Sequence, residues 1–151
     1  MAIPRYLTRT LLIVAVLAVV SVFAQQHIAA QRYFPVLKIS SPDDGLTFHV
    51  IQDAVQERRA CGEANDRMLN PVKSSCKQCA VVYARCEREL QDDEAALVAN
   101  GPTPYYQVAT TAVRLTIYGP DAAARAACEQ IAGGMIKAGL KTAVCVSPKR
   151  K

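Results

Sequence analysis

The hydrophobic pattern of this chain begins with an uncharged apolar run, Leu11–Ala24, which follows Arg5 and Arg9. A positive start before an apolar stretch of 14 residues is typical of an export signal. The run is short for a spanning helix, which needs about 20 apolar residues, but residues 25–30 carry no Lys, Arg, Asp or Glu and could extend it. We therefore expect residues 1–24 to be either a signal peptide cleaved near Ala24 or a retained signal-anchor helix that reaches about residue 30.

Both versions place the remainder outside the cytoplasm, because the two arginines hold the N-terminus inside. The alternative, a buried helix of a cytosolic protein, lacks a second segment this apolar to pack around it. After the leader, residues 25–45 are typical of a connector, with Pro35, Pro42 and a turn at residues 43–45. Within this connector, Val36–Ile39 has the composition of a short strand.

Two apolar stripes at helical spacing then predict two helices, over Phe48–Leu69 and over Ser75–Ala99. The stripes consist of Ile51, Ala54, Val55, Cys61, Met68 and Leu69 in the first and of Cys79, Val82, Tyr83, Cys86, Leu90 and Leu97 in the second. Asn70-Pro71 is expected to end the first helix, and Asn100-Gly101-Pro102 the second. Because the connection is short, the two helices should form an antiparallel hairpin.

The last third of the chain has a different period. Apolar and polar residues alternate over Val113–Tyr118, which predicts a strand, and residues 105–112 either extend it or form a strand before it. A helix should run from Asp121 to about Gly139, and residues 142–146 should form a returning strand. We expect this βαβ unit to contain a parallel pair with a right-handed crossover. The predicted fold class is α+β, with one small domain over residues 46–147 and a basic tail at 148–151.

The C-terminal unit also carries a resemblance. Val113–Pro120 (VRLTIYGP), the Ala-rich helix after it and Ala138-Gly139-Leu140 resemble one half of a SPOR domain, a small envelope module that binds peptidoglycan. The resemblance covers about a quarter of the chain, and no matching first half precedes it. It implies a βαβ fold for this segment, and we transfer no binding residues from it.

Six cysteines allow 15 pairings, and geometry ranks them. If the helical hairpin turns near Lys73, Cys61 and Cys86 lie at matching distances from the turn on facing apolar stripes. At the C-terminal end, Cys128 lies about ten residues (~15 Å) before its helix ends. Cys145 lies about five residues (~16 Å) into the returning strand. We therefore predict disulfides Cys61–Cys86 and Cys128–Cys145.

The remaining pair, Cys76 and Cys79, forms the only C-x-x-C motif. At the start of a predicted helix and beside Lys77, such a thiol has a lowered pKa, and thioredoxin-like proteins use this motif for thiol–disulfide exchange. Those proteins place the motif after a strand, whereas here a helix is predicted before it. The alternatives are a local structural disulfide, cross-pairing with Cys61 or Cys86, and a metal site formed with Cys86.

No other cluster of residues indicates catalysis, and the sequence predicts no cofactor and no metal. The histidines are His27, beside the leader, and His49, which we expect on the surface at the start of the first helix. The acidic residues Glu87, Glu89 and Asp92–Glu94 lack the spacing of a calcium loop and indicate a solvated helix face.

The charge distribution limits the partners. Of 18 basic and 13 acidic residues, the excess is accounted for by Arg5, Arg9 and the three basic residues at 149–151. The body is charge-balanced, which argues against a nucleic-acid partner. We expect a non-enzymatic envelope module, either periplasmic or anchored in the inner membrane by its N-terminal segment, that contacts an envelope protein or a cell-wall polymer. The alternative function is thiol–disulfide exchange at Cys76 and Cys79.

Overall fold

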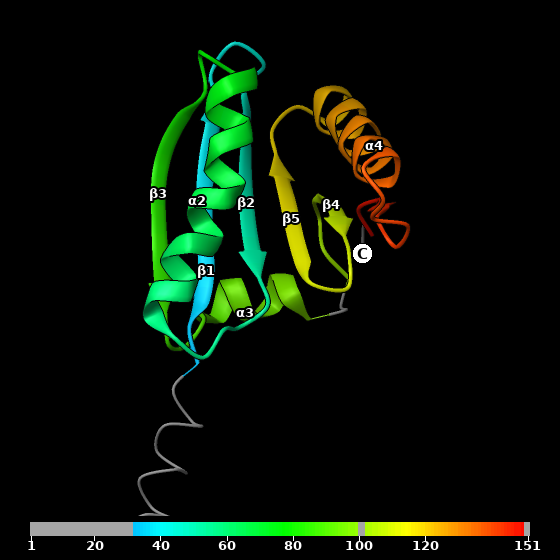
Figure 1. Cartoon of the computed structure of the whole chain (residues 1–151). Coiled ribbons are helices and arrows are strands. Elements are labelled where there is room, and N and C mark those ends of the chain that lie inside the picture. The colour runs from blue at the N-terminus through cyan, green and yellow to red at the C-terminus, as the bar shows by residue number, and fades with distance from the viewer. Residues whose placement is uncertain (1–31, 100–101, 150–151) are drawn as a thin grey trace, which may run out of the picture.

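The computed structural model describes residues 32–99 and 102–149, and within them the chain forms six strands and three helices (Figure 1). The elements are β1 Phe34–Ser41, β2 Leu46–Gln52, α2 Arg58–Ser75, β3 Ala80–Glu87, α3 Asp92–Val98, β4 Tyr106–Ala109, β5 Val113–Tyr118, α4 Asp121–Lys137 and β6 Val144–Val146. The predicted signal or anchor segment lies outside the described residues. In those residues, no helix combines the length and the apolar character needed to cross a membrane.

All the strands belong to one antiparallel sheet in the order β3-β1-β2-β5-β4-β6. The chain is built from two ββαβ halves, β1-β2-α2-β3 and β4-β5-α4-β6, and the second half repeats the strand order of the first in reverse on the other side of the central β2–β5 pair. In each half the helix leads to a strand that returns to the outer side of the first strand. Helix α3 connects the two halves.

One face of the sheet forms the apolar core. In β5, Val113, Leu115 and Ile117 point toward α2 and α4, as their alternation predicts. The buried core consists of Leu37, Ile39, Leu46, Val50, Leu69, Val108, Leu115, Ile117, Ala124, Cys128 and Ala132. Helices α2 and α4 cover this face, whereas α3 lies across one end of the opposite face (Figure 1).

Two glycines permit the turns of the sheet to approach each other. Gly45, at the end of the β1–β2 turn, has φ +62°. Gly119 follows β5 with φ +147°, and a Cβ there would lie 2.8 Å from the carbonyl oxygen of Gly45 and 2.6 Å from Leu46 Cδ2. Only glycine fits this position without movement of the backbone.

The N-terminal half corrects the helix predictions. The stretch predicted as the start of the first helix forms β2, and α2 begins only at Arg58. Leu46–Gln52 is rich in β-branched and aromatic residues, and it pairs with strands on both sides, which overrides the helical spacing. Pro71 does not end α2, because the last turn continues and the Cys76 amide donates to the carbonyl of Val72 at 2.8 Å.

The predicted second helix, Ser75–Ala99, is replaced by β3 and the short helix α3, so the helical hairpin does not form. In β3 the side chains of Tyr83, Arg85 and Glu87 alternate with those of Ala84 and Cys86. This strand pairs with β1, which lies inside the region expected to be a connector. The short strand expected at Val36–Ile39 is confirmed, and it is longer than expected.

The C-terminal half agrees with its prediction in most respects. The strand at Val113–Tyr118 and the helix after it are confirmed, and the returning strand is shorter than the predicted 142–146. Tyr106–Ala109 forms a separate preceding strand. The expected direct pairing of the two parallel strands is wrong, because β4 lies between β5 and β6 and pairs antiparallel with both.

Candidate functional site

All six cysteines lie in the described part of the chain, and all are bonded in three disulfides. The structure contains the two predicted long-range pairs, with Cα–Cα distances of 5.9 Å for Cys61–Cys86 and 5.5 Å for Cys128–Cys145. Each of them ties the helix of one half to the strand that follows it. The expected partner elements were different for Cys61–Cys86, which joins a helix to a strand and not two helices.

The third disulfide, Cys76–Cys79, follows the C-terminal end of α2. The prediction placed this motif at a helix N-terminus, and that placement is wrong. The C-terminal end carries partial negative charge, so the helix does not stabilise a thiolate at Cys76. The metal-site alternative also loses its ligands, since Cys86 is bonded to Cys61. Among residues 32–99 and 102–149, no group of three His, Cys, Asp or Glu side chains is placed to hold a metal ion.

The sheet face opposite the core carries polar and aromatic side chains. We call it the open face and define it by Lys38 of β1, His49 of β2, Tyr83 and Arg85 of β3, and Tyr118 of β5. These residues are neighbours in the strand register, where Lys38 lies opposite both His49 and Tyr83. Antiparallel sheets commonly have one packed and one solvated face, and the residues on this one determine what it can bind.

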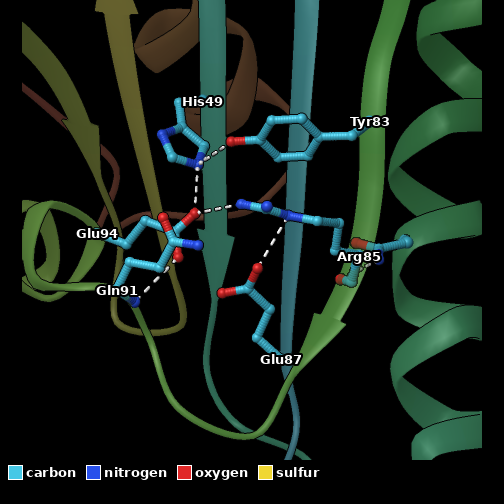
Figure 2. A network of polar contacts seen from close by, with 7 residues as sticks. His49, Tyr83, Arg85, Glu87, Gln91 and Glu94 are labelled. Atoms are coloured by element: carbon cyan, nitrogen blue, oxygen red, sulfur yellow. Dashed lines mark hydrogen bonds and ion pairs between the residues drawn. The ribbon is translucent and has the colours of Figure 1, made fainter.

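A network of buried polar groups fixes α3 to one end of the open face (Figure 2). Its centre is Glu94, which is 1% exposed. Glu94 Oε1 accepts a hydrogen bond from Arg85 Nη2 at 2.9 Å and lies 3.4 Å from His49 Nε2. Glu94 Oε2 lies 3.3 Å from the backbone nitrogen of Gln91, which completes a capping box at the start of α3. Arg85 Nε also pairs with Glu87 at 2.9 Å.

His49 is 5% exposed, and its two polar contacts lie at one ring nitrogen. Tyr83 Oη lies 3.2 Å from the same ring nitrogen, Nε2, that faces Glu94. A proton relay in the manner of a catalytic triad uses both ring nitrogens, one toward the nucleophile and one toward the carboxylate. Burial lowers the pKa of His49, against the opposing effect of Glu94, so the ring is neutral at pH 7. The contacts of His49 and Glu94 join β2, β3 and α3.

Burial also acts on the neighbouring acids. It raises the pKa of Glu87, and a hydrogen bond with Glu94 acts in the same direction. It raises the pKa of Tyr83 as well, against the opposing effect of Arg85. The carboxyl groups of Glu87 and Glu94 both pair with the guanidinium of Arg85, whose side chain is 36% exposed.

Sequence reasoning missed this network. His49 was expected on the surface at a helix start, and Glu94 on a solvated helix face, yet both are buried. The available signal was the pair Gln91 and Glu94, three residues apart, which is the spacing of a capping box before a helix.

The aromatic side chains of the open face lie close to cations. Lys38 Nζ is 5.9 Å from the ring centroids of both Tyr83 and Tyr118. The Arg85 guanidinium lies 4.0 Å from the centroid of Tyr83. Such distances allow cation–π attraction. Burial raises the pKa of Tyr118 to about 12, so its hydroxyl stays a neutral donor.

A pocket of about 340 Å³ continues the open face beyond Tyr118. We call it the tyrosine pocket; it is lined by Asp93, Ala96 and Leu97 of α3, by residues 102–104, and by Tyr105 and Tyr118. The two tyrosine rings are in contact, with centroids 4.6 Å apart. Tyr105 is 40% exposed, and Asp93 is exposed at the pocket edge. The pocket therefore combines ring faces with a carboxylate.

Comparisons of the chain with protein-family models, with curated proteins and with solved structures find no match.

Proposed function

We propose that the protein is a non-enzymatic, extracytoplasmic binding module that holds a cell-wall polymer on its open face and in the tyrosine pocket. The observation that carries the proposal is the pair of contacting tyrosines beside Lys38 on a polar sheet face. Aromatic faces pack against the apolar faces of sugar rings, while their hydroxyls and nearby charged groups bond to sugar oxygens and carboxylates.

Several features favour binding over catalysis. The buried histidine contacts a tyrosine and a carboxylate through one nitrogen, and within residues 32–99 and 102–149 it has no hydrogen bond to a serine or cysteine. The central carboxylate, Glu94, is used by Arg85 and by the helix cap. Groups that are already satisfied by each other support a rigid surface.

Charge favours a sugar polymer over a nucleic acid. Arg85 is offset by Glu87 and Glu94, whereas Lys38 makes no ion pair with another residue of the part of the chain that the structure describes. Asp93 adds negative charge beside the pocket. A phosphate backbone requires several uncompensated cations, and this face does not offer them.

The location outside the cytoplasm has two supports. The N-terminal pattern of Arg5, Arg9 and an apolar run is that of an export signal, retained or cleaved. All six cysteines are paired, as in proteins that fold in an oxidising compartment. A retained segment would hold the module at the inner membrane, within reach of the wall.

Cosedimentation of the full chain with insoluble cell-wall polymer tests the proposal. We expect Tyr105→Ala and Lys38→Gln each to weaken binding by about 5–10-fold, since each removes a contact worth about 1 kcal/mol. The matched control is Arg125→Gln, an exposed cation of α4 on the opposite side of the sheet. The proposal would be contradicted if all three variants bound the polymer as tightly as the unmodified protein, or if the control Arg125→Gln lost affinity to the same extent as the other two.

Thiol–disulfide exchange at Cys76 and Cys79 is the second candidate, and the observation favouring it lies on the other face. Both cysteines line an apolar groove between α2 and α4. That activity does not compete with binding at the open face.

A further inference from the structure

A groove of about 410 Å³ lies on the helix-covered face, between α2 and α4. The two helices lie on the same side of the sheet (Figure 1). The floor of the groove is formed by Phe48 and Val50 of β2 and Leu115 of β5. Its walls include Met68 and Val72 of α2, Ile131 and Met135 of α4, and the Cys76–Cys79 disulfide. The groove is thus an apolar site with one chemically reactive group in its wall.

The Cys76–Cys79 disulfide differs from the other two. In each of the other two bonds one cysteine, Cys61 or Cys128, is fully buried and its partner is partly exposed, whereas Cys76 and Cys79 are both partly exposed. Those two bonds close separations of 25 and 17 residues, and this one closes a separation of 3. A cross-link over a short loop restricts the unfolded chain less, so this bond contributes least to stability.

The second half, β4-β5-α4-β6, shows that the fold does not require this bond. There, the chain passes from α4 to β6 through residues 138–143, which contain no cysteine. That reversal is held by backbone hydrogen bonds, including Leu140 N to Met135 O at 2.9 Å, and by Gly139 at φ +98°. The α2–β3 connection makes the same reversal with an added disulfide, which therefore points to a use other than folding.

We propose that Cys76–Cys79 is a thiol–disulfide exchange site whose partner is a polypeptide segment with apolar side chains and a pair of cysteines, lying in the groove between α2 and α4. The disulfide in the wall selects a thiol-bearing partner over a lipid or a second copy of this chain, in which all six cysteines are bonded. Met68 and Met135 are flexible and polarizable, which suits apolar side chains of varied shape. The proposal rests on thiol–disulfide exchange, the second candidate function, and stands independently of binding at the open face.

The exchange balances without a further reagent. A thiolate of the partner attacks one sulfur of the Cys76–Cys79 bond, forming a mixed disulfide, and the other sulfur leaves as a thiolate and takes a proton from water. The partner's second thiolate then attacks its own sulfur in the mixed disulfide. The partner gains a disulfide, Cys76 and Cys79 become thiols, and two electrons pass from partner to protein.

The first test measures the three disulfides separately. The oxidised full chain is equilibrated in glutathione buffers of graded ratio, alkylated and analysed by mass spectrometry. We expect Cys76–Cys79 to be half-reduced at about a tenfold milder reducing ratio than the other two bonds, with an unchanged circular dichroism spectrum. Reduction of all three bonds together, only as the protein unfolds, would overturn the proposal.

The second test measures the partner preference. Two synthetic dithiol peptides, one with Leu and Met around its cysteines and one with Ser and Asn, are mixed with the full chain. We expect the apolar peptide to be oxidised about fivefold faster, because its apolar side chains are removed from water when they bind in the groove. Met135→Lys should remove this preference, whereas Ile136→Lys should keep it, since Ile136 is the exposed neighbour outside the groove lining.

Two further variants complete the design. Met68→Lys changes the opposite wall and gives the same readout if Met135→Lys does not fold. Cys79→Ser leaves Cys76 to retain a disulfide-bearing probe as a stable mixed disulfide, detected by its mass. Equal rates for the two peptides, or a preference that survives both lysine variants, would show that the groove does not receive the partner.

Discussion

Replacing Glu94 tests whether the buried network holds α3 against the sheet. Two substitutions separate its contacts. In Glu94→Gln the side-chain amide oxygen can still accept a hydrogen bond from the backbone N–H of Gln91, so the helix cap is kept. The charge-assisted bond from Arg85, at 2.9 Å, is weakened. In Glu94→Ala both contacts are lost and a cavity is left, because the site is 1% exposed.

The magnitudes follow from the contacts. A hydrogen bond between charged groups contributes about 1.5–3 kcal/mol. Arg85 is 36% exposed and keeps Glu87, so Glu94→Gln should cost only about 1–2 kcal/mol of unfolding free energy. Glu94→Ala adds about 1 kcal/mol for the cap and a further term for the cavity, for a total of about 3–4 kcal/mol.

Urea unfolding followed by far-ultraviolet circular dichroism measures these differences at pH 7. The chain has no tryptophan and six tyrosines, so tyrosine fluorescence provides a second probe. The matched control is Glu89→Gln, an exposed acid in the same β3–α3 connection, which should change stability by less than about 0.5 kcal/mol. If Glu94→Ala unfolds at the urea concentration of this control, the network does not secure α3, and the rigid-surface argument for the open face fails with it.

Three further outcomes follow from single features. Burial lowers the folded-state pKa of His49, so below about pH 6.5 the unfolded chain binds more protons at this residue than the folded chain does. The free energy of unfolding should therefore fall as the pH falls below this value. In urea unfolding at a series of pH values, His49→Gln should make this fall smaller. Tyr118 should ionise near pH 12 in an absorbance titration, and Tyr118→Phe should remove that late step. Gly119→Ala should lower the free energy of unfolding by about 2 kcal/mol or more, because of the clash and the backbone strain at φ +147°. Gly134 in α4 has open space around it, and Gly134→Ala should raise the free energy of unfolding by about 1 kcal/mol, as measured by thermal unfolding.

The sequence was sufficient for the C-terminal half because its strand and helix periods are clear. Val113, Leu115 and Ile117 alternate with polar neighbours and lie on one packed face. The prediction missed only the insertion of β4 between the two parallel strands. That insertion depends on hydrogen bonding between distant backbones, which has no signature in a local window.

The Cys61–Cys86 bond was predicted from a hairpin that does not exist. From Cys61 to Ser75, α2 rises about 21 Å at ~1.5 Å per residue. From Ala80 to Cys86, β3 covers about 20 Å at ~3.3 Å per residue. The two cysteines are therefore level across a helix–strand pair that turns at residues 76–79, and two helices turning near Lys73 give the same match. The spacing of cysteines determines which positions can meet, and it does not determine the secondary structure between them.

In the N-terminal half, β2 and β3 were missed and β1 was predicted only over Val36–Ile39, for a physical reason. In β1, the consecutive residues Pro35, Val36 and Leu37 are all buried, because this interior strand is covered on both faces. Such a strand has no apolar alternation. In β3, an edge strand, the residues Val82, Tyr83 and Cys86 happen to fit helical spacing, although pairing with β1 decides the conformation. The buried network could not be predicted once these strands were misassigned, since it joins β2, β3 and α3.

A comparison of the two ββαβ halves indicates where functional residues are to be expected. Both halves share the hairpin, the helix, the returning strand and a disulfide between helix and strand, and these shared features are what the fold requires. Two features have no counterpart in the other half: α3 with its buried carboxylate, and Cys76–Cys79 in the groove wall. The first shapes the end of the open face, and the second places a reactive bond beside an apolar site. Because neither is needed to complete a ββαβ unit, these two places are where the chain departs from its own repeat, and both proposals are located there.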